Sequence, residues 1–96
     1  MRAARVDANQ AEIVAALRKA GCSVTPTHKA GEGFPDLAVG YRGRTFLIEV
    51  KDGSKPPSAR VLTEAQVRWH GQWLGHKAVV CNVDEALLAV GIRVAE

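Results

Sequence analysis

The fold is best predicted from residues 36–50, which read Asp-Leu-Ala-Val-Gly-Tyr-Arg-Gly-Arg-Thr-Phe-Leu-Ile-Glu-Val. Two apolar runs, 36–41 and 44–50, flank Arg42 and Gly43, and the glycine supplies the positive φ that a two-residue turn requires. The pattern predicts a β-hairpin. Because both runs are apolar on both faces, we expect the two strands to lie in the centre of a sheet.

The register of this hairpin brings two carboxylates together. If residues 42–43 form the turn, Asp36 lies directly opposite Glu49, with Cβ atoms about 5 Å apart. Two ionised carboxylates at that distance repel by about 3 kcal/mol at an effective dielectric near 20. Lys51 points to the same face, and a divalent cation between the carboxylates would compensate more strongly. An all-oxygen site with room for water and a phosphate suits Mg²⁺ or Mn²⁺.

The alternative is that Asp36 and Glu49 are solvated residues at the ends of strands, with Lys51 as a neutralising neighbour. Both carboxylates, however, fall at the same end of an otherwise apolar hairpin. Two loops rich in glycine or proline, 29–34 and 52–62, adjoin that end. This coincidence favours a functional site.

The rest of the chain predicts three helices and two further strands. In chain order we expect a helix over 8–20, a strand over 22–28, the hairpin, a helix from Thr63 to Gly75, a strand over 77–81 and a helix over 84–90. The segment 44–81 has the strand-helix-strand form of a parallel crossover. We therefore expect an α/β fold with a mixed central sheet and helices on both faces.

Two helix starts carry capping signals. Asp7 is followed three residues later by Gln10, and Thr63 is followed at the same spacing by Gln66. This spacing is typical of a residue that caps a helix and a partner that bonds back to it. We expect both pairs to fix helix N-termini.

Trp69 and Trp73 lie four residues apart on the second predicted helix. This spacing places both rings on one face of the helix. Exposed pairs of this kind can stack on nucleic-acid bases, but aromatic residues at this spacing are far more often part of a core. We therefore predict that both tryptophans are core residues.

Composition and charge exclude several classes of protein. With 96 residues, 47% hydrophobic and 24% charged, we expect one globular domain over 1–96, near the lower size limit for an adequate core. No apolar run approaches the roughly 18 residues of a membrane span, and the N-terminus lacks the apolar core of a signal peptide. We expect a cytoplasmic protein with no membrane partner. The net charge of +3 permits binding to a polyanion without singling one out.

The motif residues resemble those of a known nuclease superfamily. Pro35-Asp36 followed by Glu49-Val50-Lys51 is similar to the PD-(D/E)XK signature, and the order of elements resembles its restriction-endonuclease-like αβββαβ core. More narrowly, the segments 33–37, 48–51 and 62–66 resemble the VRR-NUC family. The resemblance is to the compact type found alone in phage and bacterial genomes, and it covers residues 7 to 90.

The resemblance implies a metal-dependent endonuclease that hydrolyses DNA phosphodiester bonds. Asp36, Glu49 and the backbone carbonyl of Val50 would bind Mg²⁺ or Mn²⁺. Lys51 would orient or help deprotonate the attacking water and stabilise charge on the phosphate. The stand-alone relatives imply structure-selective cutting of branched DNA, such as a Holliday junction, by a homodimer with paired sites. No nucleotide cofactor is expected, and the residues are compatible with one or two metal ions and with DNA or RNA.

Two further residues have both a functional and a plain interpretation. Glu12 matches an acidic residue that many members of the superfamily add to the metal site. It lies beside the apolar stripe of Ile13 and Leu17, where a surface glutamate is also common. Gln66 matches a glutamine of the family site, and its alternative role is the capping bond described above.

Basic residues near the carboxylates are candidates for phosphate contacts. The loops 29–34 and 52–62 and the N-terminus of the second helix should meet at that end of the hairpin, where the helix dipole also favours anions. The candidates are Lys29, Lys55, Arg60, Arg68 and His70. Each could equally be a solvated surface charge.

Two other functions are compatible with the sequence. The chain could be a non-catalytic DNA-binding or assembly subunit that retains the nuclease fold, or a small protein-interaction module with an incidental acidic pair. A domain that only binds DNA gains nothing from clustered carboxylates, because they repel phosphate. We therefore favour the enzyme.

Overall fold

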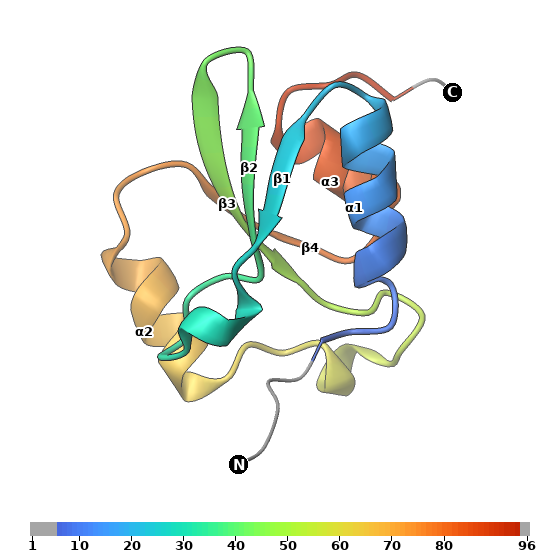
Figure 1. Ribbon diagram of the computed structural model, residues 1–96. Coiled ribbons are helices and arrows are strands. Elements are labelled where there is room, and N and C mark those ends of the chain that lie inside the picture. The colour runs from blue at the N-terminus through green and yellow to red at the C-terminus, as the bar shows by residue number, and fades with distance from the viewer. Residues whose placement is uncertain (1–5, 95–96) are drawn as a thin grey trace.

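A computed structural model describes residues 6–94 of the chain. Within these residues the chain forms a mixed four-stranded sheet and three α-helices, an α/β arrangement (Figure 1). The elements are α1 (Gln10–Lys19), β1 (Ser23–Pro26), β2 (Leu37–Tyr41), β3 (Arg44–Val50), α2 (Glu64–Gln72), β4 (Lys77–Val80) and α3 (Val83–Ala89), with short 3₁₀ turns η1 (His28–Ala30) and η2 (Pro57–Ala59). The predicted order of helices and strands is confirmed. None of the helices described in 6–94 is long and apolar enough to cross a membrane.

The sheet order is β1-β2-β3-β4, so the hairpin strands are central, as predicted. β1, β2 and β3 are antiparallel, and β4 pairs with β3 in parallel after the crossover through α2. Tyr41 pairs with Arg44 and Leu37 pairs with Ile48, which is the register expected from a two-residue turn. Asp36 and Glu49 are the next residues beyond the last of these pairs.

The hairpin turn places both of its residues in the left-handed region. Arg42 has a φ of 50° and Gly43 a φ of 79°. Two positive φ angles are characteristic of a type I′ turn, which follows the twist of the flanking strands. Glycine adopts this conformation freely, whereas the Cβ of arginine is crowded by the backbone.

Replacing Arg42 with asparagine should raise the free energy of unfolding by about 0.5–1 kcal/mol, because asparagine tolerates the left-handed region better. The substitution also removes a cation–π contact, in which the Arg42 guanidinium lies 5.3 Å from the centroid of the Tyr41 ring. The expected gain already includes the loss of this contact. Urea unfolding measures the change. Arg44→Asn is the matched control, since it alters an exposed arginine in a strand. Equal losses of stability in both variants would contradict the assignment of strain to the turn.

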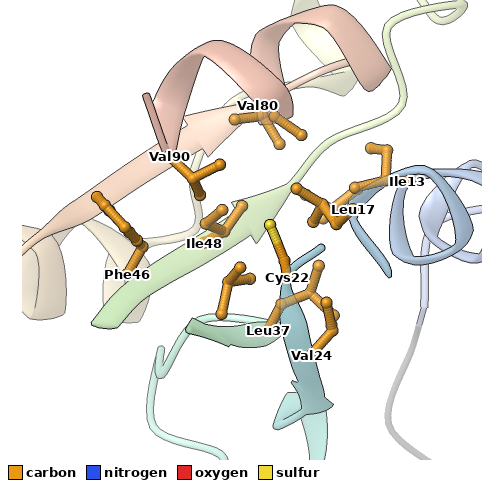
Figure 2. Packing of buried hydrophobic residues seen from close by; sticks show 12 residues of the cluster. Ile13, Leu17, Cys22, Val24, Leu37, Phe46, Ile48, Val80 and Val90 are labelled. Carbon is orange, nitrogen blue, oxygen red and sulfur yellow. The ribbon is translucent and has the colours of Figure 1, made fainter. Parts of the chain in front are cut away.

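One face of the sheet carries the hydrophobic core. α1 and α3 pack against each other and cover this face (Figure 1). Ile13 and Leu17 of α1 are completely buried, as their helical spacing indicates. Figure 2 shows them converging with Leu37, Ile48 and Val80 between the helices and the sheet. This packing fixes the two central strands and therefore the positions of the residues at their ends.

The second face of the sheet is covered less completely than expected. Side chains alternate along β3, so Glu49 points away from Ile48 and Val50 and toward this second face. α2 reaches this side through Gln66, whose side chain bonds to Glu49. None of the α2 side chains is buried, however. The helix covers the end of the face where Glu49 lies rather than its whole surface.

Trp69 and Trp73 are not core residues, contrary to the prediction. Trp69 is half-buried, and 39% of the surface of Trp73 is exposed. Their rings stack with centroids 5.0 Å apart and an interplanar angle of 17°. Phe34 packs edge-on against both, at 5.4 Å from Trp69 and 6.4 Å from Trp73. The three rings form a separate cluster outside the core.

The cluster lies outside the core because α2 packs on the loop before β2 instead of on the sheet. Gly33 approaches α2 so closely that a Cβ atom there would lie 2.3 Å from the carbonyl oxygen of Ala65. α2 also ends at Gln72 rather than at Gly75, because the backbone of Trp73 turns to an extended conformation with a ψ of 126°. The i, i+4 spacing placed the rings on one side of the helix but did not identify what they pack against.

Candidate active site

Asp36 is anchored by the strand that it faces. It directly precedes β2, and its Oδ2 accepts a hydrogen bond from the amide of Val50 at 2.8 Å. The amide and carbonyl of one strand residue project to the same edge of the strand, so the Val50 carbonyl also points toward β2. The structure therefore brings Asp36, Glu49 and the Val50 carbonyl to one end of the hairpin.

Glu49 is a buried carboxylate whose two oxygens differ in their contacts. The residue is 2% exposed. Its Oε2 accepts a hydrogen bond from Gln66 Nε2 at 3.0 Å and lies 3.9 Å from Lys51 Nζ. Its Oε1 is buried and has no hydrogen-bond partner among the described residues. Burial of an oxygen in this state costs free energy unless a donor or a cation approaches it.

The environment of Glu49 strongly disfavours its charge. Burial raises the pKa of Glu49, and the adjacent carboxylate of Asp36 raises it further, to about 9. Asp7 adds a smaller repulsion, and the positive charge of Lys51 opposes these effects. At neutral pH the Glu49 carboxyl group therefore holds a proton in the absence of a bound cation.

The donors at this end of the hairpin fit a small, hard cation. Asp36, Glu49 and the Val50 carbonyl offer oxygen atoms, which are the ligands that Mg²⁺ and Mn²⁺ prefer. Within residues 6–94, no group of three or more His, Cys, Asp or Glu side chains is placed to hold an ion. Mg²⁺ commonly binds through one or two carboxylates and keeps several waters. The orphaned Glu49 oxygen is the feature that such a cation would satisfy.

Lys51 is positioned by Gln66. Its Nζ donates a hydrogen bond to Gln66 Oε1 at 2.9 Å, and its side chain is 12% exposed. Its backbone amide donates to the carbonyl of Val80 at 2.9 Å, which fixes the chain as it leaves β3. The ammonium group is thus held beside the carboxylate pair instead of extending into solvent.

Gln66 caps α2 and contacts the site with the same side chain. Its Oε1 accepts from the amide of Thr63, and Thr63 Oγ1 accepts from the amide of Gln66, so the predicted capping box is present. The same Oε1 accepts from Lys51, and Nε2 donates to Glu49. The two roles that the sequence offered as alternatives are therefore combined. The cap at the start of α2 orients the amide toward the carboxylate pair.

Glu12 does not join the carboxylate pair. It is exposed on the first turn of α1 and lines a hollow beside Asp52 and Asn82. The N-terminal acidic residue whose charge acts on Glu49 is Asp7. Sequence reasoning assigned Asp7 to a helix cap and so missed this contribution.

Asn9, not Asp7, is the N-cap residue of α1, and its side chain serves the tertiary structure. Its Nδ2 donates to the carbonyls of Lys51 at 3.2 Å and Cys81 at 3.0 Å, and the helix start has no side-chain capping bond. Asn9 therefore ties α1 to the ends of β3 and β4, next to the candidate site. The local sequence carries no signal for bonds of this kind, because their partners are distant in the chain.

The segments that carry the candidate phosphate contacts, which are η1, the loop after β3 and α2, lie toward the same end of the sheet (Figure 1). Lys29 in η1, Lys55 in the loop after β3 and Arg68 on α2 are all exposed. Arg60 follows η2 and is half-buried, and its Nε is buried without a hydrogen-bond partner in the described part of the chain. The exposed members carry positive charge on the elements that border the carboxylate pair.

His70 differs from the other candidates. It is half-buried on α2, and its backbone carbonyl accepts a hydrogen bond from Lys77 Nζ. Burial lowers the pKa of His70, and the nearby charge of Lys77 lowers it further. The imidazole is therefore neutral at pH 7 and does not supply the positive charge expected of a phosphate contact.

Comparisons with protein-family models, with curated proteins and with solved structures find no match to this chain. The function of the chain is therefore inferred from the geometry and charges of the candidate site. Its central features are the buried Glu49 carboxylate beside Asp36, and Lys51 held by Gln66.

Proposed function

We propose that the chain is a metal-dependent nuclease that hydrolyses DNA phosphodiester bonds. The observation that carries the proposal is the Oε1 of Glu49, which is buried next to Asp36 and has no hydrogen-bond partner within residues 6–94. A fold gains no stability from a buried carboxylate beside a second, half-buried one, so the pair of Glu49 and Asp36 supports a bound cation. The neighbouring Lys51 adds a fixed positive charge. A divalent cation and an ammonium group side by side suit a phosphate diester.

We further propose membership of the PD-(D/E)XK superfamily, in its compact VRR-NUC branch. The order α1-β1-β2-β3-α2-β4 supports a restriction-endonuclease-like αβββαβ core. The signature residues Asp36, Glu49 and Lys51 meet at one end of the central hairpin, as they must in that architecture. Branched DNA as substrate and a homodimer with two sites form part of this proposal.

In the proposed mechanism, Asp36, Glu49 and the Val50 carbonyl would hold Mg²⁺ or Mn²⁺. A cation bound there would lower the pKa of water and polarise the phosphoryl oxygen. Glu49 would have to be deprotonated to serve as a ligand. Lys51 stabilises the negative charge that develops on the phosphate, and the amide of Gln66 keeps the ammonium group at that position.

Cleavage of defined DNA substrates tests the proposal. Labelled linear duplex, flap and four-way-junction DNA are incubated with the wild type or with Lys51→Ala, in Mg²⁺, Mn²⁺ or EDTA. We expect cleavage in Mg²⁺ or Mn²⁺, none in EDTA, and a strong loss in the variant, which should still fold and bind DNA. Binding without cleavage under every condition would favour a non-catalytic subunit. Equal cleavage by the variant would overturn the role of Lys51.

Replacing Gln66 with alanine should lower both stability and cleavage. Loss of the capping bond costs about 1 kcal/mol of unfolding free energy. Without the side-chain amide of Gln66, Lys51 and Glu49 each lose a hydrogen-bond partner. Loss of a group that orients metal ligands typically lowers activity by about 10- to 100-fold, and we expect a loss of cleavage of that size. Urea unfolding and single-turnover rates measure the two effects.

Thr63→Ala is the matched control for Gln66→Ala. It removes the hydroxyl that accepts a hydrogen bond from the backbone amide of Gln66. The side chain of Gln66 can still contact Lys51. We expect a similar loss of stability with cleavage close to that of the wild type. If both variants lose cleavage equally, Gln66 acts through helix stability alone.

A further inference from the structure

The aromatic cluster of Phe34, Trp69 and Trp73 forms one wall of a pocket outside the core. Trp69 and Phe34 line it directly, and the stacking of Trp69 on Trp73 braces the ring from behind. The pocket has a volume of about 760 Å³, within the range of small-molecule sites. It lies between the loop 30–34 and the helix α2. Aromatic rings that are braced but only half-buried present a ready stacking surface.

The polar groups of this pocket are few and of both signs. α2 contributes Arg68 and Gln72, and the loop contributes Glu32. A phosphate would meet one cation and one opposing carboxylate, which is a poor anion site. A flat, neutral ring fits better, because it can stack on the aromatic side chains and under a guanidinium while its edge meets amide and carboxylate groups.

The loop that closes the pocket is held in an uncommon conformation. Gly31, Glu32 and Gly33 have φ angles of 76°, 54° and 80°. A glutamate in the left-handed region is strained, and such strain concentrates where a loop clamps a ligand. Gly33 also seats the loop directly against the backbone of Ala65. The loop wall of the pocket is therefore held against α2 by a close backbone contact.

Both walls of the pocket continue into the candidate active site. Phe34 is two residues before Asp36, which bonds to the end of β3. Ala65 adjoins Gln66, which bonds to Glu49 and Lys51. A nucleotide close to the phosphate under attack would thus have its base within reach of the pocket.

We propose that this pocket binds an unpaired nucleobase of the strand that is cut, a proposal that rests on the proposed nuclease function. The base stacks on the ring of Trp69 and meets the ring of Phe34, which lies at 72° to Trp69, edge-on. Arg68 contributes a cation–π contact. Bases inside an intact duplex are stacked on each other and cannot enter. The preferred substrate class is therefore DNA with unpaired bases next to the cleavage point, such as a flap, a loop or the centre of a junction.

A fluorescent base analogue tests this proposal independently of cleavage. The probes are two duplexes that contain 2-aminopurine, in one fully paired and in the other as a single unpaired nucleotide. Binding and emission are measured in EDTA, where no cleavage is expected. We expect the wild type to bind the unpaired probe more tightly and to quench its emission by stacking.

Three variants define the contact. Trp69→Leu and Arg68→Gln should weaken binding of the unpaired probe by about 5- to 100-fold and reduce its quenching. Arg68 is exposed, so its replacement leaves the fold intact. Val67→Ala is the control, because Val67 is 55% exposed on α2 and does not line the pocket; it should behave as the wild type.

The outcomes separate this proposal from the nuclease function. The base pocket is wrong if the wild type gives the same result with both probes, absence of binding included. It is also wrong if Arg68→Gln and Trp69→Leu still bind the unpaired probe more tightly than the paired one and quench its emission. Cleavage in Mg²⁺ could still occur in that case. Conversely, quenching of the unpaired probe without cleavage of any substrate supports the pocket and overturns the nuclease.

Discussion

Replacing Glu49 with glutamine should lower metal-dependent cleavage by about two orders of magnitude or more and leave the protein folded. Since the pKa of Glu49 is about 9, the carboxyl group already holds a proton at pH 7 in the metal-free protein. Glutamine resembles this neutral form and can still accept the hydrogen bond from Gln66. It cannot supply the negative charge of a cation ligand. Single-turnover cleavage rates in saturating Mg²⁺ measure the loss.

Glu64→Gln is the matched control for Glu49→Gln. This variant makes the same chemical change, glutamate to glutamine, on the first turn of α2. The side chain of Glu64 is exposed there. We expect this variant to cleave at the wild-type rate. Wild-type cleavage by Glu49→Gln would remove Glu49 from the site.

The stability of the metal-free protein should fall as pH rises. The folded-state pKa of Glu49, about 9, lies above its ordinary value of 4.5, so the folded protein binds this proton more tightly than the unfolded chain does. The stabilising contribution is complete below about pH 4.5 and is lost as pH rises toward 9. We expect a decline on the order of a few kcal/mol across that interval. Urea unfolding in EDTA at several pH values measures it.

The Glu49→Gln variant isolates the contribution of this one group. The lowered pKa of His70 changes stability with pH in the opposite direction. Because the folded protein binds this proton less tightly than the unfolded chain does, stability is lost as pH falls through the range in which an ordinary histidine titrates. Both proteins contain His70, so the difference between their pH curves reports Glu49. The wild-type curve should fall more steeply between pH 5 and 9. Parallel curves would contradict the raised pKa.

Local sequence rules were sufficient for the hairpin and its carboxylates. A two-residue turn fixes the pairing of all residues along the two strands, so the positions of Asp36 and Glu49 followed from the location of Arg42 and Gly43. The capping box at Thr63 is equally local and was also confirmed. These features depend on residues that are near in sequence or paired by a regular ladder.

Features that depend on contacts between residues distant in the chain could not be predicted from local sequence rules. Asp7, and not Glu12, acts on the charge of Glu49, and Asn9 bonds to the ends of two strands that are distant in the chain. The exposure of Trp73 depends on a close approach between α2 and a loop more than thirty residues earlier in the chain, at Gly33. Helical spacing defines a face, but only the tertiary structure shows what covers that face.

Titration with Mn²⁺ tests the central claim, that the pair of Asp36 and Glu49 is a cation site, most directly. Calorimetry at neutral pH, repeated in buffers of different protonation enthalpy, reports both binding and proton release. We expect saturable binding to the wild type with release of protons, because Glu49 must lose its proton to become a ligand. Binding should be lost in Glu49→Gln. Absence of saturable binding to the wild type, or equal binding by the folded variant, would contradict the account.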